Sequence, residues 1–210
     1  SSPFTDVSEA DNSFEAFYIL NQLGYLKGYS DNTARPDAEI KRAEFLAVLM
    51  KAAGYEDASV ILSENESGFA DVPVSHWANG YINAALNREI IPLDNEFRPS
   101  DTLSFEDAIK YTVNALGYKS ECNTLIDYLI KAMDLGLLDG AEQSVGDIAT
   151  RETVANLIYN ALDVPNMEML NYGTEIVYEV PTNYHTFLSN AGIAKAKGTV
   201  EEISFAPQSK

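Results

Sequence analysis

The stretch YSDNTARPDAEIKRAEF, residues 29–45, decides the fold, because a related stretch, LDNEFRPSDTLSFEDA, returns at residues 93–108. Pro36 of the first stretch corresponds to Pro99 of the second, 63 positions later. Similarity between two segments of one chain at a fixed spacing is the signature of repeat architectures. If the chain is built from repeats, the segments on either side of both stretches should match as well.

Two more pairs of motifs flank these stretches. FTDV begins at Phe4 and returns as FADV at Phe69, 65 positions later, and the Gly-Tyr pair at Gly54 returns at Gly117, again 63 positions later. Because three anchors recur in the same order, the sequence predicts two full repeats.

A shorter third copy follows. MDLGLLDG at 133–140 echoes NQLGYLKG at 21–28, and ATRETVANLIYNALDV at 149–164 echoes IKRAEFLAVLMKAAGY at 40–55. We divide the chain accordingly into a first repeat, a second repeat, a degenerate third repeat and a tail, with the ranges 1–57, 58–120, 121–165 and 166–210.

The second helix of each repeat shows apolar residues at i, i+3, i+4 and i+7, the pattern of a helix with one buried face. These residues are Phe45, Leu46, Val48, Leu49, Ala52 and Ala53, then Ala108, Ile109, Val113, Ala115 and Leu116, then Val154, Ala155, Leu157, Ile158, Ala161 and Leu162. Little else in each repeat can cover such a face, so the three helices should pack on one another. The predicted fold class is all-α, a pseudo-threefold bundle of three repeats with shorter outer helices.

Punctuation residues bound these helices. Gly24 and Gly136 stand where the first helices of repeats one and three should end. The Arg-Pro pairs of the loops block helix continuation, since the residue before a proline avoids the α region. In the tail, 174–187 and 194–207 carry β-branched residues in partial alternation and read as one or two strands. We expect the tail to be a linker or the start of a following β domain.

Composition excludes several classes of function. The formal net charge of −18 opposes non-specific attraction to nucleic acid or anionic lipid. Cys122 is the single cysteine and is expected to be a small buried hydrophobe; with only His76 and His185 besides, no Cys/His zinc spacing can be assembled. No apolar run approaches the ~20 residues of a membrane span. The chain begins with the small residues Ser1 and Ser2, which is compatible with removal of a signal peptide.

The order of motifs resembles the S-layer homology repeat of bacterial cell-surface proteins. That order is F-x-D-V, then Trp-Ala, a helix, a Gly-containing turn, Arg-Pro, and T-R-A-E opening a second helix; here the last motif appears as KRAE at 41–44 and TRET at 150–153. The resemblance covers about residues 4–164 and is specific in the first two repeats.

This resemblance implies a module that holds a protein on the cell wall by binding a secondary cell wall polysaccharide without a covalent bond, commonly a pyruvylated one. The family takes the sugar in grooves between neighbouring repeats. Carried over to this chain, the polymer-binding residues would be Arg42, Arg151, Trp77, Asp6, Asp71, Lys41, Gly28 and Tyr29. The resemblance also implies an extracellular location in the cell wall or surface layer. We expect no cofactor.

The residues support part of this independently. A helix N-terminus has unpaired N–H groups and a partial positive charge, and an arginine there adds a planar set of donors suited to a carboxylate. Arg42 and Arg151 occupy this position, so we expect them to point into clefts. T-x-x-E is also a capping box, so plain helix capping remains open for the motif. Trp77 could stack on a sugar or fill the seam between two repeats, with packing favoured.

No repeat holds the complete set of motif residues. Phe105 replaces the arginine in repeat two, Lys41 replaces the capping threonine in repeat one, and Asn12 stands roughly where repeat two has Trp77. Repeat three lacks F-x-D-V and carries Thr153 in place of the acid. We therefore expect at most one or two competent grooves.

Other chemistry finds no support in the sequence. The acids of 94–107 are irregularly spaced and lack the central glycine of an EF-hand, and no Ser/His/Asp order, phosphate loop or basic patch appears. We expect no enzyme activity. Two further hypotheses stay open: a protein–protein interaction module of a surface layer whose grooves do not bind, and a helical domain of a surface hydrolase that contributes no chemistry.

Overall fold

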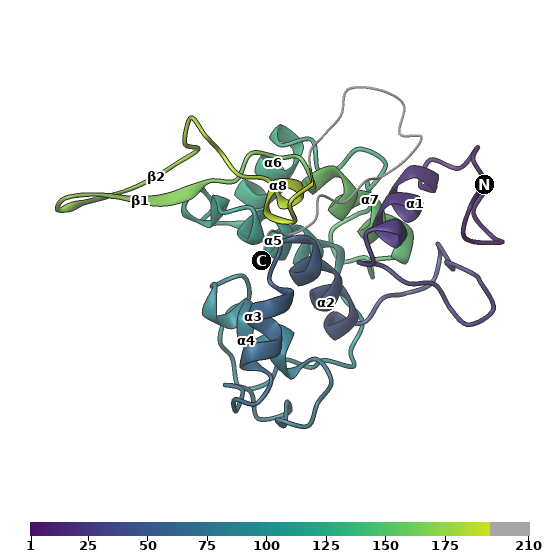
Figure 1. Ribbon diagram of the computed structural model, residues 1–210, viewed down its shortest axis with the longest axis horizontal. Helices are drawn as coiled ribbons and strands as arrows, with labels where there is room; N and C mark the ends of the chain where they lie inside the picture. Colours follow the sequence, from purple (N-terminus) through teal and green to yellow (C-terminus); the bar gives the residue numbers. More distant parts are fainter. Residues whose placement is uncertain (194–210) are drawn as a thin grey trace.

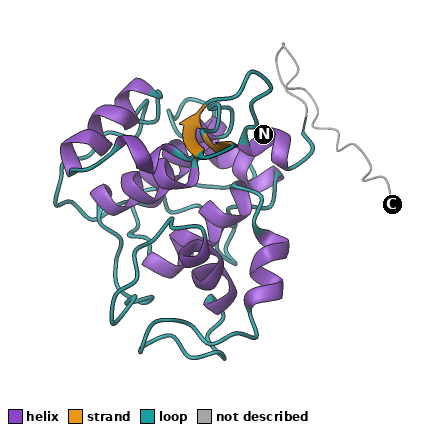
Figure 2. Cartoon of the chain, turned by 90° about the vertical axis from the view of Figure 1, so that its left-hand side faces the viewer, coloured by secondary structure: helices purple, strands orange, loops and turns teal. Residues whose placement is uncertain are grey.

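The structure is a computed structural model, and it describes residues 1–193. Helices dominate it, with one small antiparallel sheet (Figure 2). The elements in chain order are α1 (Phe14–Gln22), α2 (Arg42–Ala52), α3 (Glu56–Leu62), α4 (Asn79–Asn87), α5 (Phe105–Ala115), the short 3₁₀ helix η1 (Tyr118–Glu121), α6 (Leu125–Asp134), α7 (Arg151–Ala161), β1 (Glu168–Tyr172), β2 (Glu175–Glu179) and α8 (Phe187–Asn190).

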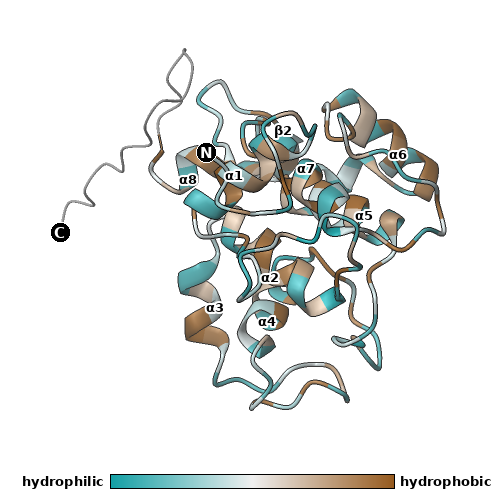
Figure 3. Cartoon of the chain, turned by 90° about the vertical axis from the view of Figure 1, so that its right-hand side faces the viewer, coloured by the Kyte–Doolittle hydropathy of each residue, from teal (hydrophilic) through white to brown (hydrophobic). Residues whose placement is uncertain are grey.

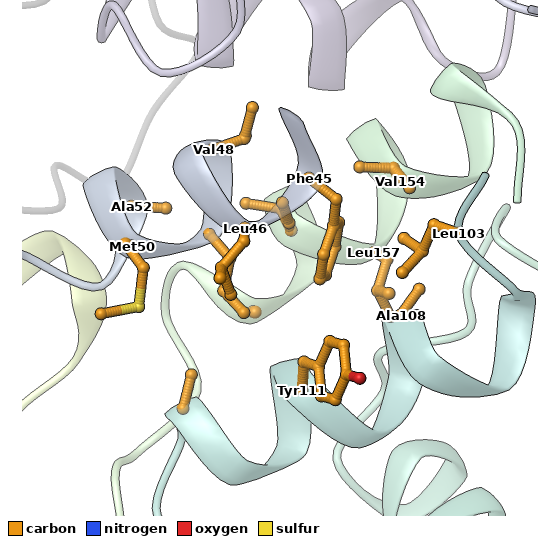
Figure 4. Packing of buried hydrophobic residues seen from close by; sticks show 14 of the residues in the cluster. Phe45, Leu46, Val48, Met50, Ala52, Leu103, Ala108, Tyr111, Val154 and Leu157 are labelled. Carbon is orange, nitrogen blue, oxygen red and sulfur yellow. The ribbon is translucent and has the colours of Figure 1, made fainter. Parts of the chain in front are cut away.

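The core lies between α2, α5 and α7, the second helices of the three repeats. Each of the three has 11 residues, and most of their side chains are buried. Phe45 of α2, Tyr111 of α5 and Leu157 of α7 meet in the middle of the cluster (Figure 4). This arrangement confirms the all-α, three-repeat prediction, since three equivalent apolar faces cover one another.

A closed ring of backbone hydrogen bonds joins the three repeats just before these helices begin. The N–H of Leu103 donates to the carbonyl of Ile40 at 3.0 Å, the N–H of Ala149 to Leu103 at 2.8 Å, and the N–H of Ile40 to Ala149 at 3.3 Å. All three residues are fully buried and stand two positions before the first residue of their helix. The ring therefore marks the pseudo-threefold axis.

The outer helices differ in how they are covered. α1 packs on α7, α4 packs on α2 and α3, and α6 packs on α5. Gly24 and Gly136 follow α1 and α6 with φ of +75° and +73°, which confirms their predicted role at helix ends because glycine adopts this conformation without strain. The residues before the two prolines, Arg35 and Arg98, leave the α region as predicted, but with positive φ of 51° and 59°.

The tail returns to the bundle in its described part. β1 and β2 form a hairpin that projects from the body (Figure 1), so the strand predicted in 174–187 is confirmed, while β1 was missed. Two backbone hydrogen bonds tie the segments on either side of the hairpin to the bundle: the N–H of Met167 donates to the carbonyl of Leu116, and the N–H of Leu188 donates to that of Leu162. Phe187, beside Leu188, is only 1% exposed. This segment thus packs against the C-terminal ends of α5 and α7. The strand predicted at 194–207 lies outside the described residues, and the repeat boundaries remain our division of the chain.

Candidate functional site: the junctions between repeats

The N-terminal ends of the three core helices are not free, which corrects the expectation that they point into open clefts. The first helical N–H of each donates to a loop carbonyl of the next repeat around the ring at 2.9 Å. The pairs are Arg42 with Asp101, Phe105 with Asp147, and Arg151 with Ala38. Because a helix leaves its first N–H groups without partners, these loops satisfy donors that we had assigned to an anion.

Arg42 is buried at the junction of repeats one and two, with 7% of its surface exposed. Its Nε donates to the carbonyl of Phe97 at 2.9 Å, Nη1 to Oδ2 of Asp107 at 2.8 Å, and Nη2 to the hydroxyl of Tyr111 at 3.1 Å. Burial opposes the charged form, but Tyr111 and Asp107 outweigh it and raise the pKa of Arg42. The guanidinium is therefore charged, and the carboxylate of Asp107 already balances this charge inside the protein.

Arg151 occupies the matching place at the junction of repeats three and one and is 6% exposed. Its Nε donates to the carbonyl of Ala34 at 2.7 Å and its Nη2 to the carbonyl of Lys27 at 2.9 Å. Within residues 1–193, no carboxylate oxygen lies within 4.0 Å of its nitrogens. The two arginines thus share a position but differ in what balances their charge.

The ring of Tyr29 lies beside two guanidinium groups, those of Arg151 and Arg35. The guanidinium carbon of Arg35 is 3.7 Å from the ring centroid of Tyr29, and that of Arg151 is 4.9 Å from it. Arg35 also pairs with Asp31 at 3.3 Å. Gly28 precedes the tyrosine where a Cβ would collide with the Phe4 ring, so only glycine lets the chain pass there. The structure therefore gathers Gly28, Tyr29 and Arg151 at one junction.

The carboxylates of Asp6 and Asp71 bond to backbone N–H groups of loops. Asp6 accepts the N–H groups of Ala34 and Arg35 at 2.7 and 2.8 Å, and Asp71 accepts those of residues 97 and 98 at 2.8 and 2.7 Å. Each carboxylate thereby fixes an Arg-Pro loop whose preceding carbonyl receives a buried arginine. Their contact with a polymer stays a prediction.

Trp77 is 61% exposed, so the favoured interpretation that it fills a seam is wrong. Its ring stacks on His76, with centroids 5.9 Å apart. Lys41 is also exposed at the start of α2, where its Nζ donates to the carbonyl of Ser100 at 3.3 Å. An exposed indole beside a polar ring can stack on a sugar face.

The third junction, between repeats two and three, has no cation at the arginine position. Phe105 is buried there, as expected of a residue that packs and cannot pair with an anion. Sequence reasoning missed the partners that distinguish the junctions, Asp107 and Tyr111 at one and Arg35 at the other. Asp107 did carry a signal, since it is the third helical residue after the capping Ser104.

Cys122 is buried, as predicted. Across residues 1–193, no three His, Cys, Asp or Glu side chains form a group that could hold a metal ion. None of the helices in this part of the chain is long and apolar enough to span a membrane.

The model of the S-layer homology domain matches residues 3–46 and 68–109. A "Cell surface protein" of Thermoanaerobacter kivui is 31% identical over 179 residues, which are 84% of this chain and 23% of that protein. A "Middle cell wall protein" of Brevibacillus brevis is 30% identical over 168 residues, 77% of this chain and 16% of that protein. A "Cellulosome-anchoring protein" of Acetivibrio thermocellus is 44% identical over 76 residues, 35% of this chain and 16% of that protein.

The chain spans about a quarter or less of the relatives described here. Other relatives carry the names of enzymes, an exoglucanase and an amylopullulanase. The two family matches coincide with the first two repeats, and the third repeat closes the same ring of hydrogen bonds. The chain therefore belongs to the S-layer homology family, as part of a bacterial protein of the extracellular cell wall or surface layer.

Proposed function

We propose that the module holds its protein on the cell wall by binding a secondary cell wall polysaccharide, an anionic one such as a pyruvylated polymer. The family and the name of the cellulosome-anchoring relative support the anchoring role. The module itself contributes no chemistry in this proposal. The observation that carries the choice of site is the difference between the two buried arginines.

The junction of repeats three and one is the proposed polymer site. Two neutral carbonyls and an aromatic ring surround Arg151, and these do not cancel its charge. Arg35 places a second guanidinium over the same ring, but Asp31 pairs with it, so the unbalanced charge is that of Arg151. A cation that no nearby carboxylate balances creates a local positive field, and this field is what an acidic protein needs to attract an anionic polymer.

The junction of repeats one and two fits the polymer's charge less well. Asp107 already sits on Arg42, and a second carboxylate would have to approach against it. We propose that this junction is mainly structural. Trp77 of repeat two and Lys41, whose Nζ bonds to Ser100 at this junction, are both exposed, and we propose them as secondary neutral and cationic contacts outside the main site.

The test is retention of the purified chain on cell wall sacculi with and without their secondary polymer. Trp77→Ala is the cleanest variant because the side chain is exposed, and Leu93→Ala, at 66% exposure, is its matched control. We expect removal of the polymer to abolish retention, Trp77→Ala to weaken it, and Leu93→Ala to leave it unchanged. Retention that does not depend on the polymer contradicts the proposal.

The arginines need a gentler change than alanine, because both hold neighbouring repeats together. Lysine keeps the charge and removes the planar set of donors. At equal folded fraction, checked by circular dichroism, Arg151→Lys should weaken retention more than Arg42→Lys. Equal effects would remove the distinction between the junctions.

A second candidate function is a protein–protein interaction module of a surface layer. The internal bonds of both arginines favour it. So do Ile126, Ile130 and Met133 of α6, which are more than half exposed in the described part of the chain. Under this function the chain binds a neighbouring surface protein, and sacculi stripped of polymer retain it equally well.

A further inference from the structure

α6 carries a row of exposed apolar side chains along one face. Ile126, Ile130 and Met133 stand at i, i+4 and i+7 and are 66%, 52% and 66% exposed. Residues at this spacing share one face of a helix. We call these three residues the α6 row. Figure 3 shows apolar colour on this outer helix at the edge of the molecule.

The equivalent helix of repeat two shows what is missing. α4 is covered by α3, and the two approach so closely that a Cβ on Gly80 would collide with the carbonyl of Ser59. Side-chain amides of Asn79 and Asn83 bond to carbonyls at the end of α3 and just beyond it, which seals the contact. Six residues of α4 are buried as a result.

In repeat three the segment before α6 is only η1, four residues long. Ala132 is the one buried residue that α6 contributes, although the helix has ten residues. The pseudo-symmetry therefore places a helix over α4 and leaves the corresponding cover of α6 open in the described residues. Contiguous exposed apolar patches are characteristic of interaction surfaces, and the spacing of these three residues makes them contiguous on α6.

Two acidic residues of α6 lie beside the α6 row. Asp127 and Asp134 are seven positions apart, so they lie along one flank of the α6 row. The N–H groups of Asn123 and Thr124 hold the pKa of Asp127 below its ordinary value, which keeps it ionised. Lys131, the one basic residue of α6, is paired with Glu121 and also attracts Asp134, which leaves two acids and one paired cation on this flank.

We propose that the α6 row docks an amphipathic helix of another protein, with an apolar face against the row and lysines or arginines facing Asp127 and Asp134. Helices that bind other helices use such spaced apolar anchors, and opposite charges on the flank fix the partner's orientation. A second copy of this chain fits poorly, because it carries 32 acidic residues against 14 basic ones.

The test uses the full chain and two synthetic helical peptides, with the same leucine face and either lysines or glutamates on the flank. Binding is measured by fluorescence anisotropy. We expect the lysine peptide to bind at least about tenfold more tightly than the glutamate peptide. Ile130→Gln should weaken binding of the lysine peptide by about tenfold, while the same change at Ile61 on α3, which is 75% exposed against 52% for Ile130, should not.

The charge is tested separately. Asp134→Lys should lower the affinity for the lysine peptide and raise that for the glutamate peptide, with no change in circular dichroism. Affinities that ignore the peptide's charge, or that Ile61→Gln lowers as much as Ile130→Gln does, overturn the proposal. So does sedimentation of the wild-type chain as a dimer that Ile130→Gln dissociates, because the partner would then be a second copy.

Discussion

The Nη1 atom of Arg42 lies 2.8 Å from Oδ2 of Asp107, across the junction of the first two repeats. Within residues 1–193, the partners of the Arg151 guanidinium at the same place one junction away are two carbonyls and the Tyr29 ring. One chain thus contains two versions of the same site, a neutralised one and a charged one. Under the proposed function, this difference separates a structural role of the motif from a binding role.

Arg42→Ala should destabilise the fold by roughly 3 kcal/mol, because it breaks a buried ion pair and leaves the Phe97 carbonyl and the Tyr111 hydroxyl without their donor. Urea denaturation followed by circular dichroism measures this. Lys41→Ala, one residue earlier and exposed, is the control and should change stability by no more than about 0.5 kcal/mol. Equal, small effects of the two changes would mean that the pair does not hold the junction.

The sequence predicted the bundle because its signals are local. Apolar period, proline and glycine positions and motif spacing all act within one repeat, and three copies of one face leave few ways to pack. The tail was harder to predict, since the fully buried Phe187 is one aromatic residue in a polar stretch, and its burial depends on contacts with residues far away in the sequence.

The site was predicted less well for a physical reason. A helix N-terminus next to an arginine looks like an anion site in any sequence, but the ring brings a loop of the next repeat onto it. Asp101 is 59 positions from Arg42, and no local pattern links them. The prediction that Trp77 is buried failed for a similar reason. An indole can fill a seam or stack on a sugar, and tertiary structure decides whether it is buried.

Asp71→Ala should destabilise the protein by about 1–3 kcal/mol, because it leaves the N–H groups of Phe97 and Arg98 without their acceptor. The loop would then lose the brace that holds Arg98 at positive φ. Thermal unfolding measures the effect. Asp94→Ala, in the exposed part of the same loop, is the control. If Asp71→Ala weakens retention on sacculi with no loss of stability, the aspartate contacts the polymer.

The Asp127 carboxylate should titrate below the usual aspartate range. N–H groups of Asn123 and Thr124 stabilise its charged form and lower its pKa. Because the pKa is lower in the folded state, the group stabilises the fold above its unfolded pKa of about 3.9, and this is lost as pH falls through the folded value. A carboxyl NMR titration reads the pKa directly. A value at or above about 3.9 would show that these two N–H groups do not bond to the Asp127 carboxylate in solution.

Phe187→Ala should release the tail from the bundle. The ring is fully buried against the core, and replacing such a phenylalanine with alanine costs about 3–5 kcal/mol. Limited proteolysis should then cut between residues 165 and 191 while the three repeats stay resistant. The backbone hydrogen bonds that join Ile40, Leu103 and Ala149 do not involve the tail. Tyr184→Ala, half exposed in the same segment, is the control and should leave the tail protected. A single unfolding transition that moves both parts together would mean that the tail and the bundle form one cooperative unit.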